Sequence, residues 1–239
     1  MPALLTENVT SGYGRQTIIS DITLSADVGT ITTIIGPNGA GKSTFAKTLV
    51  GILRPTKGRV IVNDVDITKM PGHLIPRNGL VYVPQNDNVF ATLTVNENLE
   101  VGGFAVKGNS GERLEEILNI FTDLKKARTK RAGMLSGGQQ NLLAIARALM
   151  VHPTVIILDE PTAGLSPAYT DVVWNQIDVI TKSGTAVLVV EQNVERALKH
   201  SDFVHIFIAG TNHVHGPAKE IAELDLAAIF LGRAGATHS

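Results

Sequence analysis

The sequence contains no cysteine, which excludes disulfide bonds and thiolate metal sites. No apolar run reaches the roughly 18 to 20 residues that a membrane-spanning helix needs, and the first residues lack the basic and apolar segments of a signal peptide. The formal net charge of -1 argues against broad electrostatic affinity for nucleic acid. We therefore expect a cytoplasmic protein that meets a membrane only through a partner.

What the 239 residues do contain is 44% apolar sequence, enough for one large α/β domain. Three segments are apolar without alternation, which is typical of parallel strands covered on both faces; they are residues 30–35, 155–160 and 186–190. Residues 4–10 and 22–28 alternate between apolar and polar, which favours an antiparallel sheet at the edge.

Helical patterns dominate the middle of the chain. Thr94 and Glu97 have the spacing of a capping box, and residues 111–128 carry apolar side chains at helical spacing. We predict a single domain over 1–239, in which a helical subdomain (86–150) is inserted into an α/β core with a β subdomain (1–85 and 151–239). Residues 11–14 are predicted to form a turn, the prolines at 71 and 76 to interrupt regular structure, and Pro167 to open a helix over 167–182.

The segment GPNGAGKS fits the phosphate-binding loop G-x-x-x-x-G-K-[ST], and it lies between a predicted strand and a predicted helix. Its glycines allow the backbone to wrap closely around an anion, with N–H groups facing the phosphates. We expect Lys42 to reach the β- and γ-phosphates and the Ser43 hydroxyl to ligate Mg²⁺. The predicted nucleotide-binding residues here are Gly36, Pro37, Asn38, Gly39, Ala40, Gly41, Lys42, Ser43 and Thr44.

Polar residues also follow two other predicted parallel strands, where such sheets bind ligands. Asp159 is expected to hold Mg²⁺ and Glu160 to orient or deprotonate the attacking water, although the two carboxylates could instead cap a helix. Gln192 follows the strand at 186–190. Gln85 ends a further short strand, where a neutral amide could contact Mg²⁺ or the water.

Two features are ambiguous by themselves. Tyr13 could stack on an adenine ring or pack on a neighbour. The LSGGQ segment places Ser136, Gly137, Gly138 and Gln139 at a helix start. That start could bind an anion or could be only a capped helix.

Taken together, these motifs resemble the nucleotide-binding subunit of an ABC transporter. The resemblance covers nearly the whole chain and implies a P-loop NTPase fold with a RecA-like core, an antiparallel β subdomain and an inserted helical signature subdomain. It also implies that Tyr13 stacks on adenine, that Gln85 is the Q-loop residue, and that Ser136 to Gln139 complete the ATP site of a second subunit. The implied activity is hydrolysis of Mg-ATP coupled to transport.

Two positions depart from the usual pattern of that family. Ser166 stands where an aspartate is common, and Gln192 stands where the switch histidine is common. Glutamine cannot titrate, although it can still form a hydrogen bond with the γ-phosphate. We therefore expect hydrolysis with Glu160 as the base. Alternatively, Gln192 lies outside the site and a neighbour replaces it.

The segments GLSP, VEQN, 88–104 and FLG (230–232) resemble the second ATPase subunit of branched-chain amino acid importers. Urea and short-amide importers use a similar subunit. The implied partners are a second, identical or non-identical, ATPase subunit, an integral membrane permease and, indirectly, a solute-binding protein. The permease is expected near Gln85, where Val89, Phe90 and Leu93 supply apolar surface or pack internally. A non-transport ABC ATPase or a small-molecule kinase explains these features less completely.

Overall fold

The computed structural model describes residues 2–86, 88–104 and 110–230. A six-stranded sheet in the order β10–β9–β3–β8–β7–β6 forms its centre. Its strands are β3 (Ile31–Ile35), β6 (Leu80–Val83), β7 (Val155–Asp159), β8 (Ala186–Glu191), β9 (Phe203–Ile208) and β10 (Thr211–Pro217). Only β10 is antiparallel to its neighbour, whereas β9, β3, β8, β7 and β6 run parallel. The predicted strands at 30–35, 155–160 and 186–190 are therefore confirmed.

Both faces of this sheet are buried, which explains the uninterrupted apolar runs. In β7, Val155 and Ile157 belong to a core that includes Phe45 of helix α1 (Lys42–Leu49). Ile156 and Leu158 belong to a second core that includes the long helix α6 (Pro167–Lys182). Each buried aliphatic side chain contributes roughly 1.5 to 3 kcal/mol, so this alternation fixes the register of the strand firmly.

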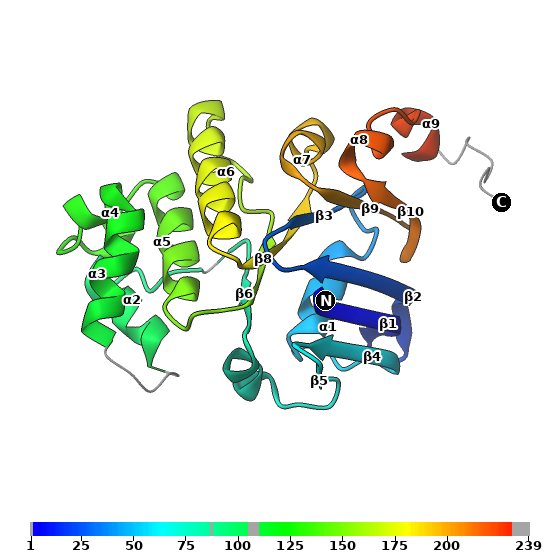
Figure 1. Ribbon diagram of the computed structural model, residues 1–239, viewed down its shortest axis with the longest axis horizontal. Coiled ribbons are helices and arrows are strands. Elements are labelled where there is room, and N and C mark those ends of the chain that lie inside the picture. The colour runs from blue at the N-terminus through cyan, green and yellow to red at the C-terminus, as the bar shows by residue number, and fades with distance from the viewer. Residues whose placement is uncertain (1, 87, 105–109, 231–239) are drawn as a thin grey trace.

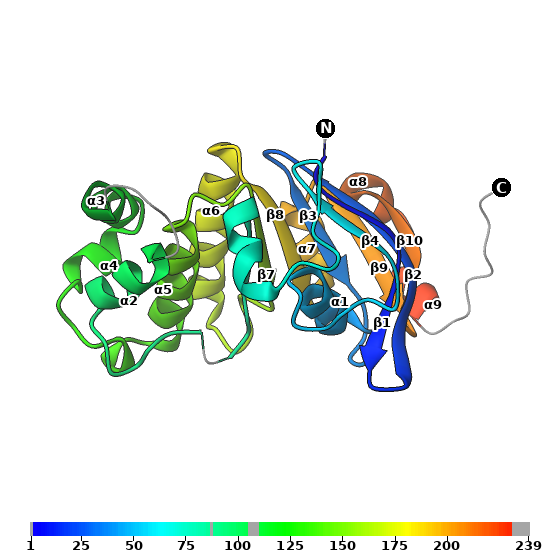
Figure 2. The ribbon, with the colours of Figure 1, turned by 90° about the horizontal axis from the view of Figure 1, so that it is seen from below.

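An antiparallel sheet in the order β2–β1–β4–β5 packs against the first core through α1 (Figures 1 and 2). Its strands are β1 (Pro2–Tyr13), β2 (Gln16–Asp27), β4 (Lys57–Val62) and β5 (Val65–Asp66). The predicted turn at 11–14 is wrong for its first three residues. Ser11, Gly12 and Tyr13 pair with β2, so the hairpin turns later and Tyr13 ends a strand.

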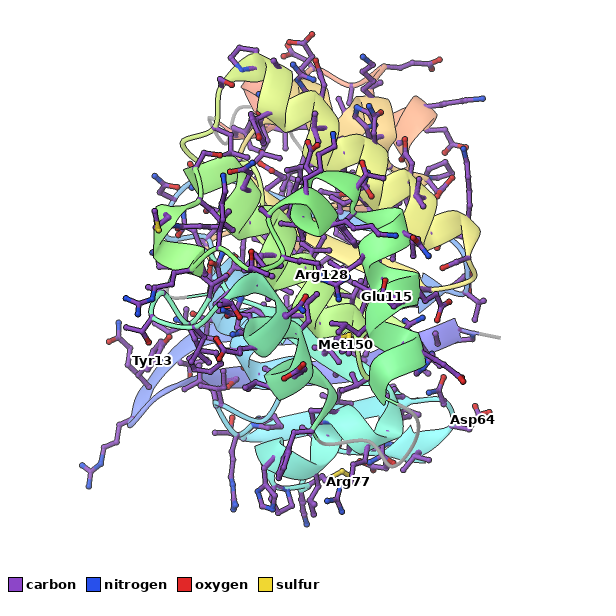
Figure 3. All side chains as sticks on the ribbon, turned by 90° about the vertical axis from the view of Figure 1, so that its left-hand side faces the viewer. Tyr13, Asp64, Arg77, Glu115, Arg128 and Met150 are labelled. Atoms are coloured by element: carbon purple, nitrogen blue, oxygen red, sulfur yellow. The ribbon has the colours of Figure 1, made fainter. Side chains whose placement is uncertain are left out.

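The helices α2 (Val95–Gly103), α3 (Ser110–Ile120), α4 (Thr122–Lys126) and α5 (Gly137–Leu149) gather on one side of the molecule (Figure 1). The predicted capping box is confirmed, because the Thr94 hydroxyl accepts a bond from the Glu97 amide and the Thr94 amide donates to the Glu97 carboxylate. The helix predicted over 111–128 is instead broken at Phe121, whose side chain is buried. Figure 3 shows Glu115 and Arg128 close together on this side of the molecule, and their ion pair of 2.7 Å ties the segment after α4 to α3.

Two segments differ from expectation or were not predicted, and two short helices follow them near the end of the described chain. The segment around the prolines at 71 and 76 is not irregular but forms a 3₁₀ helix (Gly72–Asn78) with Pro76 inside it. Helix α7 (Val194–His200) was not predicted; the Asn193 side chain caps it. Helices α8 (Ala218–Ile221) and α9 (Leu226–Phe230) pack with α7 beside β9. Leu231 and Gly232 of the FLG motif lie outside the described residues.

Candidate active site

The loop from Gly36 to Ser43 joins β3 to α1 and closes around the Lys42 side chain. The ammonium group donates to the carbonyl oxygens of Gly36 at 2.8 Å and Pro37 at 3.1 Å. A Cβ atom at Gly41, where φ is +94°, would lie 2.5 Å from the Ile19 side chain, so this turn needs glycine. Burial lowers the pKa of Lys42, and the nearby charges of Glu160, Asp159 and Glu191 oppose that shift.

Asp159, the last residue of β7, meets the beginning of α1. Its Oδ1 accepts a hydrogen bond from the Ser43 hydroxyl at 3.1 Å, and its Oδ2 accepts one from the Tyr82 hydroxyl at 2.9 Å. Burial raises the pKa of Asp159, while these two hydrogen bonds lower it. The structure therefore brings together two of the three residues that the sequence assigned to Mg²⁺, whereas the third, Gln85, contacts Glu160.

Tyr82 is a site residue that the sequence analysis missed. It pairs with Ile157 in the neighbouring strand, two residues before Asp159. Burial, followed by the charge of Asp159, raises the pKa of the Tyr82 phenol far above its ordinary value. The phenol therefore remains a neutral donor to Asp159. Only the register of the β6–β7 pair reveals this contact.

Glu160 lies just beyond β7 and is held by two amides. Its Oε2 accepts a hydrogen bond from Gln85 Nε2 at 2.7 Å, and its Oε1 accepts one from Gln192 Nε2 at 2.5 Å. Its backbone adopts a left-handed conformation (φ +49°), and its amide N–H donates to the carbonyl of Val190 at 2.9 Å. The fold thus gathers the three predicted catalytic side chains from three separate segments of the chain.

An open cavity of about 480 Å³ lies over the phosphate loop. Its lining residues are Tyr13, Ile18, Asn38, Gly39, Ala40, Gly41, Lys42, Ser43, Thr44, Gln85, Glu160 and Gln192. Tyr13 is 49% exposed and stands at the tip of the β1–β2 ribbon (Figure 3). Ile18, on the next strand, was not predicted. Gly36 and Pro37 act beneath the cavity, through the carbonyls that hold Lys42.

The LSGGQ segment lies elsewhere. Ser136 caps α5, where its hydroxyl accepts a bond from the Gln139 amide at 3.3 Å and its own amide donates to the Gln139 side chain at 3.1 Å. None of Ser136 to Gln139 is among the cavity's lining residues in the described part of the chain. A Cβ at Gly138 would lie 2.2 Å from the Tyr169 ring, whereas a Cβ at Gly137 would meet open space. Gly138 therefore has a packing role that its sequence motif did not indicate.

The donor set near the loop fits Mg²⁺. Ser43 and Asp159 supply a hydroxyl and a carboxylate oxygen 3.1 Å apart, and Mg²⁺ prefers such hard oxygen ligands. Within the described residues, no group of three or more His, Cys, Asp or Glu side chains could form a complete metal cage. Mg²⁺ commonly takes only one or two ligands from protein and the rest from phosphate and water.

Comparison with known families decides the class of the protein. A family model described as "ABC transporter" matches residues 19–163. The chain belongs to the ABC transporter family. As an ABC transporter ATPase, it binds nucleotide and hydrolyses ATP in transport. In the ranges that the structure describes, no helix is long and apolar enough to cross a membrane.

Three relatives illustrate the range of this family. The chain is 38% identical to the probable branched-chain amino acid transport ATP-binding protein LivF of Archaeoglobus fulgidus, over 92% of this chain and 94% of that protein. It is 36% identical to the high-affinity branched-chain amino acid transport protein BraG of Pseudomonas aeruginosa, over 87% and 90%. It is 32% identical to the lipopolysaccharide export ATP-binding protein LptB of Escherichia coli K12, over 93% and 94%.

Solved structures confirm the predicted fold class. The ADP conformation of MJ1267, an ATP-binding cassette of an ABC transporter, superposes with a TM-score of 0.85 at 30% identity and covers 97% of this chain and 99% of that one. A dimeric, post-hydrolysis structure of the cassette MJ0796 bound to ADP and phosphate has a TM-score of 0.79 at 26% identity, over 90% and 98%.

Proposed function

We propose that this chain is the ATP-hydrolysing subunit of an importer for branched-chain amino acids, and that it works as a dimer on the inner face of the cell membrane. The observation that carries the catalytic part is the arrangement of Glu160 between Gln85 and Gln192, at the edge of the cavity over Lys42. The choice of branched-chain amino acids as the solute is supported by the sequence identity to LivF (38%) and BraG (36%), which is higher than the identity to LptB (32%).

In the proposed reaction, Lys42 and the loop amides bind the β- and γ-phosphates, and Tyr13 stacks on adenine. Ser43 and Asp159 would hold Mg²⁺, with Gln85 as a further oxygen ligand. When bound there, the ion would supply positive charge to neutralise the phosphates. Glu160 accepts the proton of the attacking water, and the Gln192 amide donates a hydrogen bond to the γ-phosphate. Because Gln192 has no titratable group, the proton is transferred to Glu160 alone.

A second subunit supplies what one subunit lacks. Ser136 and Gly137 are exposed at the start of α5, and their helix end can donate to an anion. Since none of Ser136 to Gln139 lines the cavity of its own chain, we propose that this segment, through Ser136 and Gly138, binds the γ-phosphate held by a partner ATPase subunit. The dimeric MJ0796 cassette supports such an assembly. The partner is either a second copy or a non-identical ATPase.

A shallow groove of about 170 Å³ between the helical lobe and the core is the proposed seat of the permease. Val81, Val83 and Ala148 give it an apolar wall, and Arg147 adds a charge. The predicted surface at Val89, Phe90 and Leu93 lies outside this lining, although Arg147 lies over the Phe90 ring at 4.9 Å.

The test is co-expression with the permease and solute-binding proteins that are encoded beside this chain. We expect the three to purify together and the ATPase rate in proteoliposomes to rise when the binding protein carries leucine, isoleucine or valine. A complex that carries Glu160→Gln should show no such rise. Stimulation by urea or a short amide instead would reassign the solute, and assembly with lipopolysaccharide export components would overturn the importer.

A further inference from the structure

Glu191, the last residue of β8, is a buried carboxylate with no assigned part in hydrolysis. Glu191 is only 4% exposed to solvent. Its Oε1 accepts a hydrogen bond from the Thr162 hydroxyl at 2.5 Å. Its Oε2 accepts bonds from the backbone amides of Gln192 at 3.0 Å and Asn193 at 3.4 Å. A carboxylate at this depth is costly unless it is hydrogen-bonded, and here three donors meet it.

These bonds join the two loops that end in the proposed catalytic pair. Thr162 lies two residues after Glu160, and Gln192 directly follows Glu191. The Gln192 side chain returns to Glu160 at 2.5 Å, so the contacts form a closed ring from Glu160 through Thr162, Glu191 and Gln192. The pairing of β7 with β8 brings the beginnings of the two loops together, at Asp159 and Val190. The ring of contacts then joins the residues that follow in each loop.

Packing alone does not hold these loops in place. An open, partly polar cavity of about 400 Å³ lies between them, and Thr162, Glu191 and Gln192 all line it. The Gln192 side chain is exposed, and Glu160 is half-buried. Its lining is mixed, since Ala163 and Leu165 stand beside the polar groups. Two contacts tie the loops together: the Glu160 amide donates to the Val190 carbonyl at 2.9 Å, and the Thr162 hydroxyl donates to Glu191 at 2.5 Å. Burial raises the pKa of Glu191, and the bonds from Thr162 and the two amides lower it.

We propose that Glu191 is a positioning residue for ATP hydrolysis, because its bonds to Thr162 and to the Gln192 backbone set the Gln192 amide against the Glu160 carboxylate. Glu191 lines the second cavity and not the one over the phosphate loop. It therefore does not line the proposed ATP site, and it acts on hydrolysis through Gln192. This inference rests on the roles proposed above for Glu160 and Gln192.

The experiment is a double-mutant cycle on the purified chain, with kcat and KM for ATP measured by phosphate release. We expect Glu191→Ala to lower kcat by about tenfold, since small misplacements in a site can cost up to about 10²-fold, and to change KM by less than about twofold. In a Gln192→Ala background, the same change should cause no further loss, because the group that it positions is already gone. Glu191→Gln should restore most of kcat, because its amide oxygen can accept from the Gln192 N–H and its NH₂ group can donate to the Thr162 oxygen.

The matched control is Glu195→Gln, which changes an exposed carboxylate on the first turn of α7 and should leave kcat unchanged. If Glu191→Ala does not fold, Thr162→Val removes the same bond from the other side and should lower kcat in the wild-type background only. Two results would overturn this inference and leave the proposed function standing. In the first, the double variant loses kcat by the product of the two single losses; in the second, Glu191→Ala and Thr162→Val both keep full activity. An unchanged kcat in Gln192→Ala would overturn the role of Gln192 and the inference together.

Discussion

Replacing Glu160 with glutamine should distinguish its role in ATP hydrolysis from its contribution to folding stability. The two hydrogen bonds that Glu160 accepts, at 2.7 Å from Gln85 and 2.5 Å from Gln192, involve exposed amide side chains. A hydrogen bond to a charged group contributes about 1 kcal/mol more than one between neutral groups, and exposure reduces that difference. Both amides can also rotate to face the new side chain. We therefore expect the free energy of unfolding to fall by about 1 kcal/mol at most.

The expected effect on turnover is much larger. A positioned general base contributes about 10² to 10⁴ in rate, which corresponds to about 3 to 5 kcal/mol in the activation barrier. The affinity for ATP should change by less than about threefold, because the contacts of Lys42 and Ser43 remain. The Glu160→Gln subunit should therefore bind ATP, fail to hydrolyse it, and persist as an ATP-bound dimer.

The assay combines steady-state phosphate release, calorimetric titration with ATP and size-exclusion chromatography with light scattering. Glu223→Gln, an exposed carboxylate between α8 and α9, is the matched control. Undiminished turnover in Glu160→Gln would refute the catalytic assignment. Lost ATP affinity in a folded subunit would instead show that Glu160 acts in binding.

Three further predictions concern other parts of the structure. Gln192→His should retain or raise the ATPase rate, because imidazole can still donate to the γ-phosphate, and a complete loss would contradict the placement of Gln192. Gly138→Ala should lower the free energy of unfolding by about 1 to 3 kcal/mol in denaturant titrations because its Cβ would clash with a ring; Gly137→Ala should not, and equal effects would refute this difference. Burial lowers the pKa of His205 to about 3 from 6.5, so the unfolded chain takes up a proton first as the pH falls. Because of His205, the free energy of unfolding should therefore fall by about 3 kcal/mol as the pH is lowered from 7.5 to 4.5. In His205→Leu, the fall over the same pH range should be smaller.

Local patterns predicted the elements whose ends are fixed by neighbours in the sequence. Pro167 opens α6 where expected because its ring suits the first turn of a helix. Thr94 and Glu97 form their capping box because both partners lie within four residues. The phosphate loop was predicted for the same reason, since its glycines, lysine and serine are consecutive.

Contacts between distant segments could not be predicted in this way. Phe121 takes a non-helical conformation (φ −103°, ψ 71°) in the middle of a segment whose spacing favours one helix. The bond from Tyr82 to Asp159 depends on strand register, and the bond from Thr162 to Glu191 depends on two loops 29 residues apart. The motifs therefore indicated which residues form the site, but not which of them hold one another.

The two-residue period of β7 constrains how this protein can evolve. Asp159 continues the face that Val155 and Ile157 present to α1, which places it beside Ser43, and Glu160 turns away toward Gln85 and Gln192. Two neighbouring carboxylates thus serve different purposes because of strand parity. Inserting or deleting one residue in β7 would exchange its two cores and move each carboxylate to the wrong face. Length variation should therefore be confined to the connecting loops, while β7 keeps its length.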